Sequence, residues 1–509
     1  MQDSIGIPDL TPEAPLRKRT ARAALASGGA EIVTRILTVA LSIVTARMLE
    51  PREVGLLGLA VIMIAVISIV GFYPETAAVA ARGNATDNKY AIASTAIRAI
   101  ALCVLILLFR LGFHVLSVYL TGKDDGASEL AALVGILIWS PVAELAGGYP
   151  QVVLQRRLDL SYIAGVQLLQ PIVFVGLAVV LLLRGHGYLG VAWANLIATV
   201  IATTLLWSRL WWRRLLMWQG WPSVANWREM IGGSAKVFLG GFGGFLGERI
   251  DNLLVAGAIG PAAMSFYSMA WNASRTPANV FAKAISFVLV PTIARIHEDR
   301  ARVQRALREC LRHCYFLLTP VCAAIFVSAP LLVSFVLGPK WLPLVPCLRV
   351  MIITVLVAPF LYVASALLIG SGRAQFTGVG TVVHLTILVV LVPVLAGRWG
   401  IVGAAYAEMT ASLALTMVLL VIAQRVTRQM NRSVISAIVL PIAASVSAGA
   451  LAWTVDAHVT PDLLRLIVEL GLIVICYPLL ILLLGGRARL FDLTVLLRGV
   501  LRRQVLAAE

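Results

Sequence analysis

Residues 46–60 read ARMLEPREVGLLGLA, and residues 256–270 read AGAIGPAAMSFYSMA. Each is an apolar stretch that turns at a proline, Pro51 in the first and Pro261 in the second, and the two lie about 210 residues apart. A second pair keeps nearly the same offset: residues 184–196 read RGHGYLGVAWANL and residues 396–409 read AGRWGIVGAAYAEM, so that Gly190 aligns with Gly403. The sequence therefore predicts a duplicated hydrophobic bundle.

The composition requires lipid as the solvent of this bundle. Of 509 residues, 60% are hydrophobic and 13% are charged, which a soluble chain of this length could not accommodate without exposing most of its apolar surface. One helix needs about 20 apolar residues to cross a bilayer, and the chain offers about fourteen such windows. The predicted spans are 25–48, 54–81, 90–110, 128–149, 161–183, 187–209, 232–257, 262–291, 310–337, 345–370, 375–397, 400–424, 433–454 and 463–485.

The spacing of the repeats sets the expected organisation. Six spans separate the two matching hairpins, and because six is even, both copies enter the membrane in the same direction, as a parallel repeat. The expected segments are an N-terminal tail (1–24), a first lobe (25–209), an inter-lobe linker (210–231), a second lobe (232–424), an additional pair of spans (425–486) and a C-terminal tail (487–509). The predicted fold class is thus an all-α integral membrane protein.

The net charge of +17 is expected to set orientation in the membrane. Roughly 27 Lys and Arg lie on one set of connections and termini and about nine on the other, which predicts that both termini are cytoplasmic. No soluble basic module is present to bind nucleic acid. The cluster of Cys310, His313 and Cys314 lacks a fourth ligand nearby in sequence, so no metal site is predicted.

Ionisable residues within apolar windows indicate where function resides. Each costs about 2.5 to 3.5 kcal/mol on insertion, so those that persist usually face a cavity or one another. Guanidinium groups bind phosphate oxygens in pairs, which favours a cationic chamber for a phosphate-bearing ligand. The alternative for each residue is a structural ion pair or a side chain that reaches the headgroups. The candidate cations are Arg35, Arg249, Arg275 and Lys283.

Acidic residues in the spans are candidates for coupling to an ion. The six lysines never occur in a GxxxxGK[ST] motif, so an ion gradient or the membrane potential is the expected energy source, and no cofactor is predicted. The candidates are Glu31, Glu75, Glu144, Asp251 and Glu408. Glu31 lies four residues before Arg35, which places both on one helix face.

Two prolines occupy equivalent spans of the two lobes. Pro141 lies in the fourth span and Pro359 in the tenth, and a proline inside a helix frees a backbone carbonyl and bends the helix. We expect them to act as hinges, with a static kink as the alternative reading.

The sequence also resembles the polysaccharide (O-unit) flippase family of the multidrug/oligosaccharidyl-lipid/polysaccharide (MOP) exporter superfamily. The likeness rests on DNLLVAGAIGPAAMSFYSMA from Asp251, VLVPTIARI from Val288, LGPKWLPLVPCLRVM from Leu337 and LLIGSGRAQ from Leu367. In the first lobe, ARMLEPREVGLLGLA and VLQRRLDLSYIAG from Val153 fit the same pattern. It covers nearly the whole chain after the first 20 or so residues.

This resemblance implies a V-shaped pair of six-helix lobes with an additional C-terminal helix pair. It implies a non-enzymatic flippase in the bacterial inner membrane that moves a polyprenyl-diphosphate-linked oligosaccharide to the outer leaflet by alternating access, for exopolysaccharide, capsule or O-antigen synthesis. Arg35, Arg249 and Arg275 match, by span, the basic chamber that engages the diphosphate. A polysaccharide polymerase and glycosyltransferases are the implied partners. The alternatives are a cation-coupled exporter of drugs or other small molecules and a membrane-embedded polysaccharide polymerase.

Overall fold

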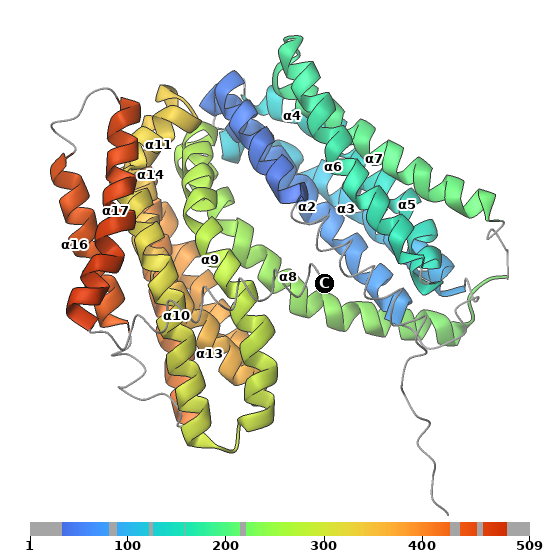
Figure 1. Cartoon of the computed structure of the whole chain (residues 1–509). Helices are drawn as coiled ribbons and strands as arrows, with labels where there is room; N and C mark the ends of the chain where they lie inside the picture. The colour runs from blue at the N-terminus through green and yellow to red at the C-terminus, as the bar shows by residue number, and fades with distance from the viewer. Residues whose placement is uncertain are drawn as a thin grey trace, which may run out of the picture. The chain divides into compact units, whose positions relative to one another are not determined.

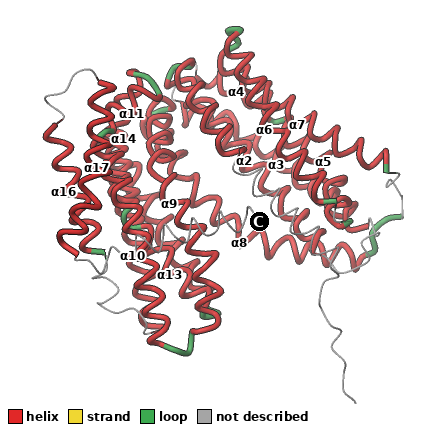
Figure 2. Tube along the Cα trace, viewed as in Figure 1, coloured by secondary structure: helices red, strands yellow, loops and turns green. Residues whose placement is uncertain are grey.

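The structure is a computed structural model. It describes residues 33–80, 89–121, 126–157, 159–213, 220–427, 438–455 and 462–485. Within these residues the regular structure is helical throughout, with no strand (Figure 2). The predicted all-α class is therefore confirmed, and the chain divides into two compact units at Gly243 and Gly244, inside one long helix.

The first unit, residues 1–243, is a bundle of packed helices (Figure 1). A helix over residues 33–48 precedes α2, and the closest pairs are α6 with α7, α2 with α3, and α5 with α7. The helices are α2 (Pro51–Ala80), α3 (Lys89–Thr121), α4 (Gly126–Leu137), α5 (Trp139–Arg156), α6 (Leu160–Leu183), α7 (Gly187–Trp212) and the first part of α8 (Val224–Ile259).

The second unit, residues 244–509, contains the rest of α8 and the remaining helices. Here α9 packs against α12 and α13, and α16 pairs with α17 and lies against α10. The elements are α9 (Pro261–Ile296), α10 (Arg300–Val327), α11 (Ala329–Val336), η1 (Pro339–Leu344), α12 (Val345–Val355), α13 (Ala358–Gly370), η2 (Ala374–Phe376), α14 (Thr377–Thr427), α16 (Val439–Val455) and α17 (Asp462–Gly485).

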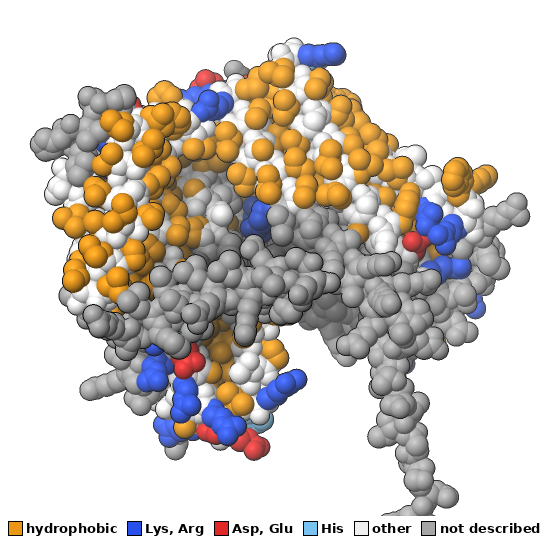
Figure 3. Space-filling model, viewed as in Figure 1, with side chains coloured by type: hydrophobic (Ala, Val, Ile, Leu, Met, Phe, Trp, Pro, Cys, Tyr) orange, Lys and Arg blue, Asp and Glu red, His pale blue; other side chains and the backbone are white. Residues whose placement is uncertain are grey.

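Much of the exposed surface along the described helices is apolar. On the face drawn in Figure 3, hydrophobic side chains cover the flanks of the described helices, and Leu111, Leu183 and Val474 are each more than 70% exposed. Among the described residues, nine segments are long and apolar enough to cross a membrane, and residues 285–296 and 439–454 form shorter apolar helices. One of the nine, residues 374–425, is long enough for two crossings, because α14 is kinked at Trp399 and Gly400. The protein is a multi-pass membrane protein.

The sequence repeat is also a structural repeat. Pro51 begins α2 and Pro261 begins α9, where the missing N–H of proline is not needed. Gly190 and Gly403 each follow the turn of a helical hairpin, where the preceding helix passes close to the glycine Cα. A Cβ on Gly190 would lie 2.9 Å from the Leu181 Cβ, and one on Gly403 would lie 2.0 Å from the Leu395 backbone oxygen. Both hairpins therefore close only because these positions are glycine.

The fourth and tenth spans are each broken into two helices. The first breaks at Ile138, between α4 and α5, and the second at Leu356 and Val357, between α12 and α13. Pro141 and Pro359 lie in the first turn after the break. Because proline has no N–H to donate to the preceding turn, the helix before the break cannot continue through it without a bend. The predicted bends are present at equivalent places, and hinge motion stays a prediction, as does the V-shaped arrangement of the lobes.

Candidate functional site

Two helices of the second unit, α9 and α14, each carry a row of mostly polar side chains along the face where they meet; we call each row a ridge. Along α9, Tyr267 and Arg275 flank Trp271 at four-residue intervals, and positions four apart share a helix face. Along α14, Glu408, Ser412 and Thr416 follow the same interval. Polar side chains from α9 and α14 therefore gather inside a bundle whose exterior is apolar.

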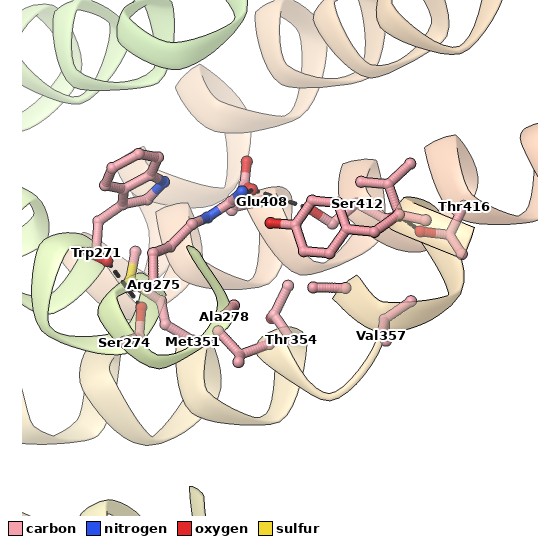
Figure 4. Close-up of a pocket in the computed structure, with 14 residues that line it drawn as sticks. Trp271, Ser274, Arg275, Ala278, Met351, Thr354, Val357, Glu408, Ser412 and Thr416 are labelled. Carbon is pink, nitrogen blue, oxygen red and sulfur yellow. Dashed lines mark hydrogen bonds and ion pairs between the residues drawn. The ribbon is translucent and has the colours of Figure 1, made fainter. Parts of the chain in front are cut away.

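An ion pair joins the two ridges. The Arg275 Nη2 lies 2.5 Å from the Glu408 Oε1, and the Ser412 hydroxyl donates to the same oxygen at 2.9 Å. The Arg275 guanidinium also lies over the Trp271 ring, 4.9 Å from its centroid (Figure 4). Because the Glu408 side chain is only 3% exposed, its charge depends on these partners for stabilisation.

His384 contacts the other oxygen of the same carboxylate. It comes from the first half of α14, before the kink, and its Nε2 lies 3.3 Å from the Glu408 Oε2. The imidazole is 10% exposed, and the contact is an ion pair only while the ring is protonated. Sequence reasoning missed His384; its signal is a histidine inside the apolar stretch of residues 377–398.

Asp251 provides a second buried carboxylate. It is 2% exposed, and it accepts hydrogen bonds from the Asn252 backbone N–H at 2.8 Å and from the Tyr267 hydroxyl at 3.1 Å. The charges of Glu408 and Arg275 both act on it. The neighbouring Asn252 is 3% exposed, and its Oδ1 has no hydrogen-bond partner among the described residues.

The cluster carries one more carboxylate than guanidinium. Asp251 and Glu408 contribute two negative charges and Arg275 contributes one positive charge, so the site is neutral only when a proton resides on His384 or on a carboxylate. A cavity of about 30 Å³ adjoins Arg275 and Glu408, which is room for about two waters. The net charge of this buried cluster therefore depends on whether one of these groups holds a proton.

The equivalent ridge in the first unit is uncharged. The alignment that places Gly190 over Gly403 places Asn195 over Glu408 and Thr199 over Ser412. Asn195 accepts a hydrogen bond from the Ser140 hydroxyl at 3.1 Å, and the Thr199 hydroxyl donates to the Asn195 backbone oxygen at 3.0 Å. The repeat thus keeps a polar helix face and has charges in the second unit only.

The first unit has its own buried charge at another place. Arg98 on α3 is 7% exposed and interacts electrostatically with Glu144 on α5, while the Ser68 hydroxyl on α2 donates to the same carboxylate. These three side chains line a cavity of about 10 Å³, which is room for about one water. Glu144 is therefore tied to a cation that was not among the predicted site residues.

The remaining predicted residues are distributed as follows. Arg35, on the helix over residues 33–48, and Arg249, on α8, are both exposed. Glu31 lies outside the described residues, so its pairing with Arg35 stays a prediction. Glu75 and Lys283 lie on α2 and α9, and their side chains are outside the described set. Arg275 and Glu408, which the sequence assigns to different roles, form one ion pair.

Comparisons with known proteins agree with this architecture. Residues 44–346 match the family described as polysaccharide biosynthesis protein, which is more than half of the chain. A search of curated proteins finds no match.

Several solved structures share the fold. The lipid II flippase MurJ, in an inward closed conformation, is 12% identical with a TM-score of 0.71, and the match covers 90% of this chain and 98% of MurJ. An inward-facing multidrug resistance MATE family transporter of the MOP superfamily is 16% identical with a TM-score of 0.62, covering 78% and 94%. A MOP superfamily transporter from Pyrococcus furiosus is 15% identical with a TM-score of 0.52, covering 81% and 96%.

The family match and the fold match both extend over the two compact units. The matched family spans both compact units, and the fold neighbours are membrane transporters aligned over nearly their whole length. The chain therefore belongs to the polysaccharide biosynthesis protein family, and it shares its fold with these membrane transporters.

Proposed function

We propose that this protein is a flippase that moves a polyprenyl-diphosphate-linked oligosaccharide from the inner to the outer leaflet for exopolysaccharide, capsule or O-antigen synthesis. The observation that carries the proposal is the combination of the polysaccharide biosynthesis family with a transporter fold. The movement is alternating access, without chemical conversion of the substrate. The protein acts in the bacterial inner membrane with both termini cytoplasmic, beside a polymerase and glycosyltransferases that consume and supply its substrate.

Two exposed cations are the proposed diphosphate ligands. Arg35 and Arg249 are exposed although they lie on helices of a membrane bundle, which is costly unless they reach water or an anion. Arg275 differs, because Glu408 already neutralises it. It engages the diphosphate only after that pair separates.

Separation of the pair couples transport to a proton. A proton on Glu408 removes the charge that holds Arg275, and His384 is placed to deliver it at 3.3 Å. Asp251 and Tyr267 are the other ionisable groups of this cluster. The membrane potential also favours export of an anionic headgroup from an inside-negative cell, at about 2.3 kcal/mol per charge per 100 mV.

The test of substrate begins with deletion of the gene. We expect lipid-linked oligosaccharide to accumulate on the cytoplasmic leaflet, measured by its protection from an impermeant periodate reagent. Arg35→Ala and Arg249→Ala should fail to relieve the accumulation, while Arg302→Ala, an exposed arginine paired with Asp299, should relieve it fully. Normal glycan export in the deletion strain would refute the proposal.

The test of coupling uses purified protein in proteoliposomes. Wild-type flipping should change with internal pH, because the proposed cycle protonates and deprotonates this cluster. His384→Gln should flatten that profile, and His186→Gln, a change at an exposed hairpin turn, should leave it intact. An unchanged profile in His384→Gln would show that another group carries the proton.

A cation-coupled exporter of small molecules is the second candidate. It is favoured by the fold shared with the MATE family transporter and by the charged cluster within the second unit. This function predicts that deletion sensitises cells to cationic dyes and leaves glycan export unchanged, the opposite of the outcome expected for a flippase.

A further inference from the structure

A groove lies between α10, α12 and α16 of the second unit, away from the charged cluster. Its volume is about 420 Å³, within the size range of ligand sites in proteins. Nearly all of its lining is apolar, and Val446 and Ala450 of α16 face it as exposed side chains. Since the protein spans a membrane, a hydrocarbon chain is the natural occupant.

The length of the groove corresponds to one leaflet. Its lining on α16 runs from Ile442 to Trp453, which is about 16 Å along a helix. The hydrocarbon core of a bilayer is about 30 Å thick, so the groove reaches about half-way through it. This depth suits an acyl chain, whereas a polyprenyl chain long enough to anchor an oligosaccharide exceeds it.

A polar layer closes the inner end of the groove. The Ser445 hydroxyl donates to the Thr319 Oγ1 at 2.7 Å, and the Thr319 hydroxyl lies 3.2 Å from the Pro441 backbone oxygen. On the α12 side, the Tyr315 hydroxyl donates to the Leu356 backbone oxygen. Because these groups satisfy one another, the inner end presents no site for a headgroup.

A cation marks the outer end. Arg349 of α12 stacks on the Trp453 ring at 4.8 Å and on the Phe326 ring at 5.4 Å, and its Nε donates to the Phe326 backbone oxygen at 3.1 Å. Both aromatic residues lie near the ends of their helices, where aromatic side chains mark the membrane interface.

The charge of Arg349 is not neutralised by the protein. Arg465, near the start of α17, lies 3.2 Å from the Glu469 carboxylate. By contrast, no carboxylate lies within ion-pair distance of Arg349 in the part of the chain that the structure describes. Its guanidinium is held in a fixed orientation by two rings and one carbonyl, with further N–H donors left for an anion.

We propose that this groove binds one glycerophospholipid of the surrounding bilayer, with an acyl chain along α16 and the phosphate on Arg349. The apolar wall accommodates the acyl chain, and the depth of the groove matches one leaflet. The guanidinium of Arg349 matches one phosphate diester. The lipid fills the space between α16 and the bundle, which fastens the C-terminal helix pair to α10 and α12. This inference is independent of the transported substrate.

The test is native mass spectrometry of the full-length protein, delipidated in detergent and titrated with dioleoylphosphatidylglycerol. We expect one bound lipid per chain for the wild type and about tenfold weaker binding of dioleoylglycerol, which has the same chains and no phosphate. Arg349→Gln should weaken phosphatidylglycerol binding about tenfold and leave dioleoylglycerol binding unchanged, because only the phosphate contact is lost.

A groove-filling variant provides a second measurement with a matched control. Ala450→Phe places a ring in the groove and should abolish binding of both lipids, whereas Leu451→Phe, on an exposed position of α16 outside the groove lining, should bind as the wild type does. Equal binding by wild type and Ala450→Phe would overturn the proposal. Displacement of phosphatidylglycerol by an equal amount of polyprenyl phosphate would also overturn it, because the occupant would then be a polyprenyl lipid.

Discussion

At the scale of single residues, the protein places two carboxylates and one arginine inside a membrane bundle. Asp251 and Glu408 are each 2% exposed, and Arg275 neutralises one of these charges. Breaking a buried pair by removing one partner costs about 3 to 5 kcal/mol, because the other charge remains without compensation. Arg275 is the sensitive member, since its loss leaves two like charges close together.

Arg275→Gln should therefore lower the free energy of unfolding by about 3 to 5 kcal/mol. The loss should be larger at pH 8 than at pH 5, because acid protonates the carboxylates and removes their repulsion. Thermal unfolding of the purified protein measures both effects. Arg302→Gln, which removes an exposed ion pair with Asp299, should cost at most about 1 kcal/mol.

The double variant Arg275→Gln with Glu408→Gln separates a structural role from a functional one. It removes both charges of the pair and should regain most of the stability lost in Arg275→Gln. If the pair also couples transport to a proton, the double variant folds yet flips substrate slowly and without pH dependence. Recovery of transport together with stability would make the pair purely structural.

The sequence identified three of the four ionisable positions of this cluster but did not predict how they are arranged. Asp251, Arg275 and Glu408 stand out because charge in an apolar window is costly. The sequence does not reveal that they pair, because Arg275 and Glu408 are 133 residues apart and meet only when α9 packs against α14. His384 was missed because a neutral histidine carries no such cost and gives a weaker signal in an apolar stretch.

At the scale of elements, the helical hairpins depend on close approach at glycine. The predicted spans end and resume at these two turns, at residues 183 and 187 and at residues 397 and 400, in agreement with the structure. The kink at Trp399 and Gly400 turns α14 back on itself, and Gly400 adopts a φ of 60°, which favours glycine. Gly403 then passes the Leu395 carbonyl, which belongs to the backbone and cannot rotate away.

Gly403→Ala should consequently prevent closure of this hairpin. Its Cβ would lie 2.0 Å from the Leu395 oxygen, so we expect a large loss of folded protein, measured as the monodisperse yield in detergent. Gly397→Ala is the control, because a Cβ there meets nothing within 4 Å and should leave the yield unchanged. Gly190→Ala should have an intermediate effect, since its nearest contact is the Leu181 Cβ at 2.9 Å.

The broken spans lead to a prediction about rate. Pro359 lies just after the break between α12 and α13, so Pro359→Ala restores the N–H that could continue the helix. We expect a small change in the unfolding temperature and slower flipping in proteoliposomes if the break bends during transport. Pro393→Ala, inside the first half of α14, is the control, and equal rates for the two variants would indicate a static kink.

At the scale of the whole molecule, the distribution of cations predicts orientation across the membrane. The last turn of α9 carries Arg295, and the first turns of α10 carry Arg300, Arg302 and Arg305, all exposed. The connection at the other end of α10, through α11 and η1, contains Lys340 alone among Lys and Arg. Because basic connections stay in the cytoplasm, the α9 to α10 turn should be cytoplasmic and η1 external.

Thiol labelling in intact cells tests this orientation. The six native cysteines, none of which forms a disulfide, are first replaced, and one cysteine is introduced at an exposed position, Glu298→Cys in the α9 to α10 turn or Leu342→Cys in η1. An impermeant maleimide should label Leu342→Cys in whole cells and Glu298→Cys only after the membrane is permeabilised. The reverse pattern would show that the protein has the opposite orientation, with η1 on the cytoplasmic side. An anionic headgroup that leaves an inside-negative cell would then enter the protein at the η1 side, which we assign as the exit.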